Sequence, residues 1–598
     1  MISYRSSGLF TVIVFFAILL LILSSTPDPA KLTASIENSA GQLAEYVPNP
    51  KLPKFDDFKF HLLPPTAHKP PEEKNSTGGG SKWYSNWQWR NPFSSSITLD
   101  ENRSVLPPLR LRPPIYTYYD STSKKDKDVI EADKGLLLAW RRAWFAQGFR
   151  PVILGPQDAM KNQLYKVFNT KGLDEHLVVE FMAWLAWSRM GNGILADWKC
   201  FPMAHYDDTF LSYLRRGSMP EKIIRVEGLG SALFSGEKTH IIEATKQVAD
   251  NLKIKEAKSI IELLGEDTFK VEKTAALAHY NSTTITSKYP SVAERLDKSP
   301  SQGRSALVDL INTHLQISFQ SEFSSGLSVL KPFPDYTSAL VSPGVRLATL
   351  LSECLPIQMP PSCPPNNPKC QLCNEASRMK ISQPDGYKND SALFTIGILP
   401  HPYTLVTLKK GDNNITITYI RRETKRDPWL IAATKHYLGT ERDSTSRVSA
   451  FKDVVAGDHG LSRGIWFTVE TLPAKSEEES LPLSVLDDLD WHFGFKVPRK
   501  TRSERAKEAT ASKQKSQRNL PAEAPVAEKK SKLGKENELI ETARELLKND
   551  PKDIHIKAVT EAWNLADTEV WRFVRAYRAR SVVERQAWEE EEKGFAGS

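Results

Sequence analysis

The residues with the clearest chemical potential follow a short apolar run in the first half of the chain. The sequence GNGILADWKC, which ends at Cys200, places Asp197 directly after a predicted strand and Lys199 two residues later. A carboxylate at a strand end can hold a divalent cation that stabilises a leaving diphosphate. Lys199 opposes metal binding by Coulomb repulsion, so either the lysine neutralises the diphosphate itself or Asp207 or Asp208 supplies the missing carboxylate. A third reading is that Asp197 only ends the strand and forms a salt bridge with Lys199.

The cysteines form a second chemical group. Four of the five lie within twenty residues, at Cys354, Cys363, Cys370 and Cys373. Such a cluster can bind zinc or form two disulfides. The proline-rich spacing favours two disulfides in an oxidising compartment. The fifth, Cys200, is predicted to be a buried apolar residue.

The elements around Asp197 predict an α/β fold. A strand at Ile115–Asp120, a helix at Asp128–Gln147 and a strand at Pro151–Gly155 follow in direct succession, which indicates a parallel pair with a crossover helix. A second helix, capped by Asp174, runs to about Arg189 and leads through a glycine turn into the strand before Asp197. The tryptophans at helical spacing are expected in the core: Trp140, Trp144, Trp184 and Trp187.

The helix, glycine turn and acidic strand end also carry a family resemblance. The segment Glu180–Met203 resembles glycosyltransferase family 32, in which a helix leads into Gly-Gly-hydrophobic-Tyr-x-Asp-x-Asp. Asp197 stands at the family's first aspartate, whereas Lys199 stands at the second. The segment Gly228–Val248 is similar to the family's small-residue turn and strand before a helix, where small residues let the backbone approach the donor sugar. The resemblance covers about residues 115–250.

This resemblance implies a nucleotide-sugar-transferase-like (GT-A-like) mixed sheet with flanking helices. It implies a nucleotide sugar as donor, most simply GDP-mannose, a divalent manganese or magnesium cation as a possible cofactor, and a glycan or glycoprotein acceptor. The expected catalytic residues are Asp197 and Lys199, and the expected metal ligands are Asp197, Asp207 and Asp208. The expected donor-binding residues are Tyr119, Asp120, Gly193, Ser235 and Gly236. The rival reading is a catalytically inactive luminal binding or scaffold protein, which the lost second aspartate allows.

The N-terminus predicts a membrane anchor. Residues 8–25, GLFTVIVFFAILLLILSS, are apolar and free of charge, near the lower limit for a transmembrane helix. Arg5 precedes them and favours a cytosolic tail at residues 1–7, hence a single-pass type II protein of the Golgi or endoplasmic reticulum. A cleaved signal peptide is the alternative, and it too leaves the bulk of the chain in the lumen. Five glycosylation sequons then become luminal, at Asn75, Asn102, Asn281, Asn389 and Asn414.

Composition divides the rest of the 598 residues. We expect a stem at 26–114, a transferase-like domain at 115–350, a cysteine-containing β-rich region at 351–495, a disordered basic linker at 496–535 and a helical tail at 536–598. The β-rich region is expected to hold strands near 393–398, 403–408 and 415–420. The net charge is +8, but much of the excess lies in the linker, so nucleic-acid binding is not expected.

Overall fold

A computed structural model gives the fold. It describes residues 67–70, 106, 112–122, 126–166, 173–217, 221–331, 338–400 apart from 375 and 377, 428–438, 444–456, 463–472, 481–507, 565–593 and 595. The expected anchor at 8–25, nearly all of the stem and the two strands expected between 403 and 420 lie outside these residues. Within the part described, no helix is long and apolar enough to cross a membrane.

The first sheet contains six strands in the order β2-β1-β3-β6-β5-β7. Their bounds are β1 Pro114–Tyr118, β2 Arg150–Leu154, β3 Gly193–Ala196, β5 Ile223–Val226, β6 Leu233–Gly236 and β7 Phe269–Glu272. The strands β1, β2 and β3 are mutually parallel, β6 runs antiparallel to both β3 and β5, and β5 is parallel to β7. The predicted parallel pair is confirmed, and the class is mixed α/β.

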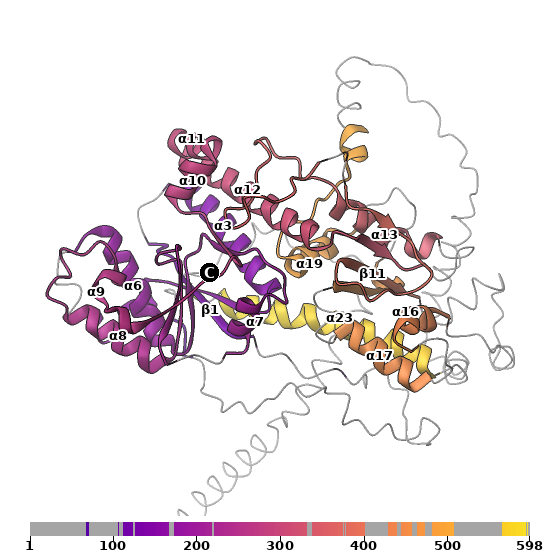
Figure 1. Cartoon of the computed structure of the whole chain (residues 1–598), viewed down its shortest axis with the longest axis horizontal. Coiled ribbons are helices and arrows are strands. Elements are labelled where there is room, and N and C mark those ends of the chain that lie inside the picture. The colour runs from indigo at the N-terminus through magenta and orange to yellow at the C-terminus, as the bar shows by residue number, and fades with distance from the viewer. Residues whose placement is uncertain are drawn as a thin grey trace, which may run out of the picture.

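Helices bury both faces of this sheet (Figure 1). Successive strand residues point to opposite faces, so Ile115 and Ile194 join the core beneath α3 and α12, whereas Tyr116 and Leu195 join the core beneath α6 and α8. The helices that follow these strands are α3 Lys127–Ala146, α4 Pro156–Met160, α6 Glu175–Met190, α7 Thr209–Arg215, α8 Lys238–Asp250, α9 Ile260–Leu263, α10 Ser282–Lys288, α11 Pro290–Lys298 and α12 Pro300–Glu322. All four tryptophans expected in the core are at most 1% exposed.

The glycine turn before Asp197 is a steric requirement. Asp174 caps α6 as predicted, accepting a hydrogen bond from the His176 amide at 2.9 Å. The helix ends at Gly191, whose φ is 99°, and β3 begins at Gly193, whose φ is 153°. A Cβ atom on Gly193 would lie 2.8 Å from the ring of Tyr116. Both positions therefore need glycine, and the turn fixes where β3 starts.

A second sheet is parallel throughout, with the order β10-β9-β11-β12. Its strands are β9 Gly326–Val329, β10 Ile381–Ser382, β11 Leu393–Leu399 and β12 Gly464–Thr468, and its helices are α13 Ser338–Ser352, α16 Pro428–Leu438, α17 Ser444–Ala456, α19 Leu483–Phe493 and α23 Leu565–Glu592. The expected β-rich region at 351–495 is wrong for the residues described, because α16, α17 and α19 hold more of them than the strands do. The boundary at 350 is wrong too, because β11 pairs with β9 across it.

The basic linker expected at 496–535 begins as folded chain. Val497 is fully buried, and Arg499 forms ion pairs with Asp487 at 2.7 Å and Asp490 at 2.8 Å. The basic segment contains few acidic residues of its own, and the two carboxylates that pair with Arg499 lie earlier in the chain, on α19. The segment therefore looked like unpaired positive charge in the sequence. The expectation is therefore wrong for 496–507, and residues 508–535 lie outside the described part.

The C-terminal helix α23 connects the two sheets (Figure 1). It packs against β12 and α17 of the second sheet, and its last turn reaches β2 of the first. There, Glu591 pairs with Arg150 at 3.0 Å, and Glu592 lies 3.2 Å from the buried ring of His68. The other ring nitrogen of His68 lies 3.1 Å from Asp158 on α4. Burial lowers the pKa of His68, but hydrogen bonds to these two carboxylates outweigh burial and raise the pKa to about 9.

Candidate functional site

The candidate site lies where two neighbouring parallel strands end. Tyr119 and Asp120 directly follow β1, and Asp197 directly follows β3, which pairs with β1. Carboxyl ends of parallel strands meet at one edge of a sheet, and ligands of open α/β sheets bind at that edge. The sheet thus brings together three of the residues singled out from the sequence.

Asp197 is held by its backbone and by a histidine from elsewhere in the chain. Its amide donates to the Ala232 carbonyl at 2.8 Å, and its carboxylate accepts from the Lys199 amide at 2.7 Å. A two-stranded ladder of β4 Cys200–Pro202 with β8 Leu277–His279 places Cys200 opposite His279. The Nε2 atom of His279 consequently lies 3.6 Å from Oδ1 of Asp197.

This pair is partly exposed to solvent. The Asp197 side chain is 37% exposed and that of His279 is 12% exposed. Burial acts to raise the pKa of Asp197, but the interactions with His279 and Lys199 outweigh it and hold the pKa below its usual range. Asp197 is therefore an anion at neutral pH, and it pairs with His279 rather than forming the Lys199 salt bridge of the third reading. The Lys199 ammonium lies 5.4 Å from the centre of the Trp198 ring.

A second cluster adjoins the pair through aromatic contact. Trp198 meets Tyr119 edge to face, with ring centres 5.5 Å apart. The Tyr119 hydroxyl donates to the carboxylate of Asp133 at 3.0 Å, and Nε of Arg304 lies 2.5 Å from the same carboxylate. Asp133 is fully buried, whereas the Arg304 side chain is 25% exposed. Burial, followed by the charge of Asp133, raises the pKa of Tyr119, so its hydroxyl stays protonated.

Three expected donor-binding residues lie at the wrong end of the strands. In the antiparallel pairing of β3 with β6, Gly193 lies opposite Gly236 and Ala196 lies opposite Leu233. Ser235 therefore lies three residue steps along the strand from Asp197, and Gly193 and Gly236 lie four steps away, which is about 10 to 13 Å at about 3.3 Å per residue. Ser235 is fully buried, and a Cβ on Gly236 would lie 3.2 Å from Ile223. These positions pack the sheet, so the structure does not bring them together with Asp197.

The two aspartates expected to complete a metal site make other contacts. Asp208 caps α7, accepting from the Phe210 and Leu211 amides at 2.9 and 3.0 Å. Asp207 lies 3.4 Å from Arg463. Asp120, at the end of β1, accepts from the amide and the hydroxyl of Thr122 at 2.8 and 2.7 Å. Within the residues described, no group of three or more His, Cys, Asp or Glu side chains could hold a metal ion.

The predicted disulfides are confirmed. Cys354 is bonded to Cys373 and Cys363 to Cys370, while Cys200 is a buried free thiol whose pKa is raised by burial. Of the sequons, Asn281 lies at the N-cap of α10, where its side-chain oxygen accepts from the Thr284 amide at 2.7 Å. Asn389 is exposed. Asn75, Asn102 and Asn414 lie outside the described residues.

The comparison with known families covers most of the chain. One family model, described as a domain of unknown function (DUF8765), matches residues 77–598. The chain belongs to this family. No curated protein and no solved structure matches the chain. The family is thus defined over both sheets, both disulfides and α23 together, and the activity must be argued from the site.

Sequence reasoning missed three residues of the site: His279, Asp133 and Arg304. Asp133 left a signal, because it lies three, four and seven residues before Leu136, Leu137 and Trp140 on the buried face of α3. A carboxylate on such a face needs a partner. His279 and Arg304 left no comparable signal, because their contacts depend on pairings distant in sequence.

Proposed function

We propose that this chain is a membrane-anchored luminal glycosyltransferase that moves a hexose from a nucleotide sugar to a glycan or glycoprotein. The observation that carries the proposal is the position of Asp197, an ionised carboxylate at the open carboxyl end of β3 and beside the end of β1. A mainly parallel sheet with one reversed strand, β6, and an acidic motif after a central strand also resembles the GT-A-like arrangement implied by the sequence.

The residues around Asp197 suit the stabilisation of a leaving diphosphate. Such a reaction needs fixed charges near the developing negative charge more than it needs a dedicated base. Lys199 follows the strand end beside Trp198, and Arg304 pairs with the Asp133 carboxylate that also binds the Tyr119 hydroxyl, so two cations adjoin the aromatic pair. The buried Asp133 fixes Arg304 in place.

A divalent cation at this position would be bound partly by protein side chains and partly by the donor. Asp197 and His279 offer one carboxylate and one imidazole at the same place. Cations bound through so few protein ligands commonly take further oxygens from substrate phosphates. The cation would supply charge for the departing diphosphate, while the Lys199 amide would keep the Asp197 carboxylate oriented.

Two observations support the luminal location. Two disulfides in one short segment are typical of an oxidising compartment. The exposed sequon at Asn389 and the partly buried one at Asn281 are compatible with glycosylation. The Asn281 cap uses the side-chain oxygen, which leaves its nitrogen for the glycan.

A catalytically inactive binding protein is the second candidate. The observation that favours it is Lys199 in place of the second aspartate, together with the contacts of Asp207 and Asp208 away from any shared metal site. Such a protein would bind the nucleotide sugar or a glycan without turnover.

A donor screen with the full-length chain in detergent distinguishes the two candidates. GDP-mannose is tested first, followed by UDP-linked hexoses, each with manganese and with a chelator. The transferase proposal expects donor hydrolysis or transfer that Asp197→Asn abolishes. Saturable donor binding without turnover would favour the binding protein, and absence of both binding and turnover would overturn the transferase proposal and the nucleotide-sugar-binding form of the second candidate.

A further inference from the structure

The position of the His279 side chain depends on its backbone. Within the described part of the chain, the Nδ1 atom of this ring is buried and has no hydrogen-bond partner, while Nε2 lies 3.6 Å from Asp197. The ring is therefore not anchored by a hydrogen bond on the side away from Asp197. The place of β8 decides whether the ring reaches the carboxylate.

The ladder of β4 with β8 needs support from its surroundings. It is a two-stranded pair outside the six-stranded sheet, and a two-stranded pair alone is marginally stable at best. On the side of β4, Trp144 of α3 donates to the Cys200 carbonyl at 3.0 Å. On the side of β8, the support comes from residues 362–370, here called the bracing loop, in which Cys363 is bonded to Cys370.

Asn366 of the bracing loop holds the beginning of β8. Its side-chain amide donates to the Ala275 carbonyl at 2.7 Å and, over a longer 3.4 Å, to the Met203 carbonyl. The Met203 amide in turn donates to the Ala276 carbonyl at 2.8 Å, which continues the ladder by one step. One side chain thus contacts both chain segments at this end of the ladder.

Ser362 of the bracing loop holds the other end of β8 through a buried histidine. Tyr280, which directly follows His279, has its hydroxyl 2.7 Å from Nδ1 of His314 on α12. The Nε2 atom of His314 lies 3.1 Å from the Ser362 hydroxyl. Burial lowers the pKa of His314 to about 3, so its neutral ring accepts a hydrogen bond at one nitrogen and donates at the other. The bracing loop therefore reaches β8 at both ends.

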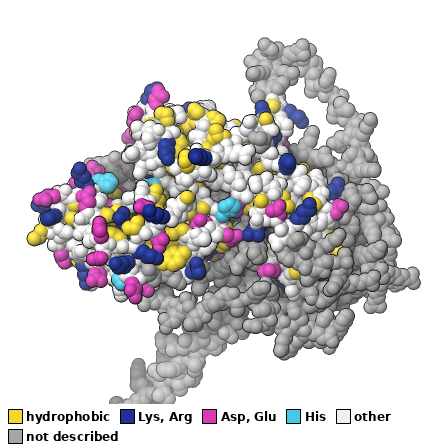
Figure 2. Space-filling model, in the orientation of Figure 1, with side chains coloured by type: hydrophobic (Ala, Val, Ile, Leu, Met, Phe, Trp, Pro, Cys, Tyr) yellow, Lys and Arg dark blue, Asp and Glu magenta, His cyan; other side chains and the backbone are white. Residues whose placement is uncertain are grey.

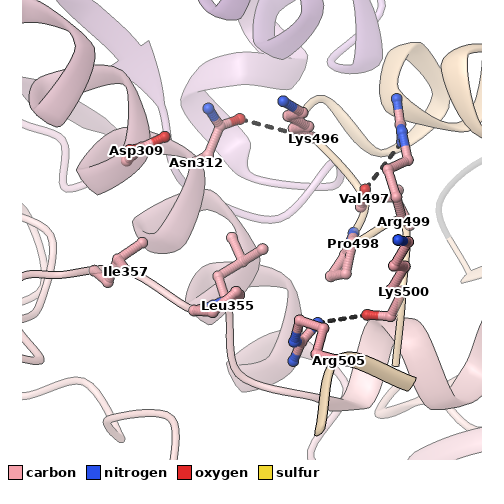
Figure 3. A pocket seen from close by; sticks show the side chains of 11 residues that line it. Asp309, Asn312, Leu355, Ile357, Lys496, Val497, Pro498, Arg499, Lys500 and Arg505 are labelled. Carbon is pink, nitrogen blue, oxygen red and sulfur yellow. Dashed lines mark hydrogen bonds between the residues drawn. The ribbon is translucent and has the colours of Figure 1, made fainter. Parts of the chain in front are cut away.

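The bracing loop is itself held in place. The Tyr289 hydroxyl donates to the Cys363 carbonyl at 2.7 Å, and the Lys288 ammonium donates to the Pro365 carbonyl at 3.1 Å. The chain that leads into the loop, Leu355–Ile357, instead lines a cavity of about 330 Å³, with Lys496–Lys500 on the other wall (Figure 3). The contacts with Tyr289 and Lys288, together with the disulfide, which limits the conformations of the loop, keep its polar groups aimed at β8.

We propose that the bracing loop is a positioning element of the candidate site, with Asn366 as its main positioning residue. By holding both ends of β8, the loop holds the His279 ring beside the Asp197 carboxylate. Its effect on sugar transfer rests on the proposed function, whereas its effect on the place of His279 does not. A displacement of about 1 Å at a reacting group lowers a rate by up to about 10², so a loop that never touches the substrate can still control the reaction.

The nuclear magnetic resonance signal of the His279 ring tests this role. The full-length protein in detergent is labelled with carbon-13 in its 12 histidine rings, and the His279 signal is identified by its loss in His279→Gln. Asp197→Asn gives the position of this signal when the charged partner is absent. Asn366→Ala, which removes both donated hydrogen bonds, should move the signal toward that position. Ser362→Ala, which frees His314 and Tyr280, should move it in the same direction.

Asn367→Ala is the matched control for Asn366→Ala. This neighbouring asparagine is exposed, and its contacts with Pro364 and Cys370 come from its backbone, so the His279 signal should stay in place. Histidine side chains also reach the surface at several separate places on the face shown in Figure 2, and their signals serve as internal references. A disturbance of the whole fold would move these signals as well, whereas a displacement of β8 would not.

The kinetics of sugar transfer separate this proposal from the proposed function. Asn366→Ala should lower kcat by up to about 10² with little change in KM, because the misplaced pair acts on the transition state. An unmoved His279 signal in Asn366→Ala, or an equal shift in Asn367→Ala, would overturn the positioning role even if the wild type transfers sugar. A shifted signal with an unchanged kcat would overturn the role in the reaction. A shifted signal in a protein that transfers no sugar at all would support the positioning of His279 and overturn the proposed function instead.

Discussion

Replacing Asp197 with asparagine separates the chemistry of this carboxylate from its contribution to the fold. The asparagine side chain keeps an oxygen that accepts from the Lys199 amide, which now donates at 2.7 Å. What disappears is the charge, and with it the pair with His279 at 3.6 Å. Because Asp197 is 37% exposed, we expect this pair to stabilise the fold by no more than about 1 kcal/mol, as partly exposed ion pairs do.

The effect on sugar transfer should be much larger. Loss of one electrostatic stabiliser in an active site lowers kcat by about 10² to 10³, which corresponds to about 2.7–4 kcal/mol. The assay is transfer of labelled sugar by the full-length protein, with denaturant unfolding of the same preparation. Asp174→Asn is the matched control, because it makes the same change at the cap of α6, where asparagine caps as well as aspartate.

Stability against pH gives a check that does not require a known donor. The pKa of Asp197 is lowered in the folded protein from a usual 3.8, so its stabilising contribution is present above pH 3.8 and is lost as the pH falls through the folded value. The difference in unfolding free energy between wild type and Asp197→Asn should therefore shrink below about pH 4. A wild-type transfer rate in Asp197→Asn would refute the assignment of the motif and the main argument for a glycosyltransferase.

The metal question, the disulfides, the topology and the His68 contact give the remaining predictions. If Lys199 replaces a metal, Lys199→Ala should strongly reduce sugar transfer, and a chelator should have no effect on the wild-type activity. If the protein uses a metal instead, a chelator should abolish the activity and Lys199→Ala should have little effect. The four clustered cysteines should resist alkylation until reduced, and replacing Cys354 and Cys373 by serine should lower the unfolding free energy by about 3 kcal/mol, since that bond closes a 19-residue loop; thiols reactive before reduction would contradict this. Asn281 should carry a glycan, and its surroundings should resist protease in sealed microsomes, so cleavage there would end the luminal reading. Folding raises the pKa of His68 from 6.5 to about 9, so the stabilising contribution of its charge is complete below pH 6.5 and is lost as the pH rises through about 9. The difference in unfolding free energy between wild type and His68→Gln should therefore shrink between pH 6 and 10. A constant difference over this range would refute the role of the His68 charge.

The sequence predicted the features that depend on local spacing. Apolar residues three and four apart identified α3 and α6, and the Asp174 cap and the glycine turn followed from residues adjacent in the chain. The parallel pairing of β1 with β2 followed from the strand, helix, strand order. Asp197 was found at the end of β3 for the same reason, since the turn and the strand are both local.

The sequence did not predict what depends on strand direction and distant pairing. Nothing local shows that β6 runs antiparallel to β3, and that reversal carries Ser235 and Gly236 away from Asp197. His279 meets Asp197 only because β8 pairs with β4 in a particular register. The carboxylates that fold the basic segment around Arg499 likewise lie on α19, where the sequence gives no sign that they face it.

The contact between the end of α23 and β2 also has a consequence for biosynthesis. The partner of Arg150, Glu591, lies 441 positions further along the chain and is therefore synthesised much later. At a synthesis rate of about 5–20 residues per second, that interval lasts roughly 20–90 seconds. During this time β2, the outermost strand of the first sheet, has been made but its ion pair with Glu591 has not formed. An uncovered sheet edge is a template for pairing with other chains. Nascent chains that stall before α23 should therefore aggregate more readily than the complete chain.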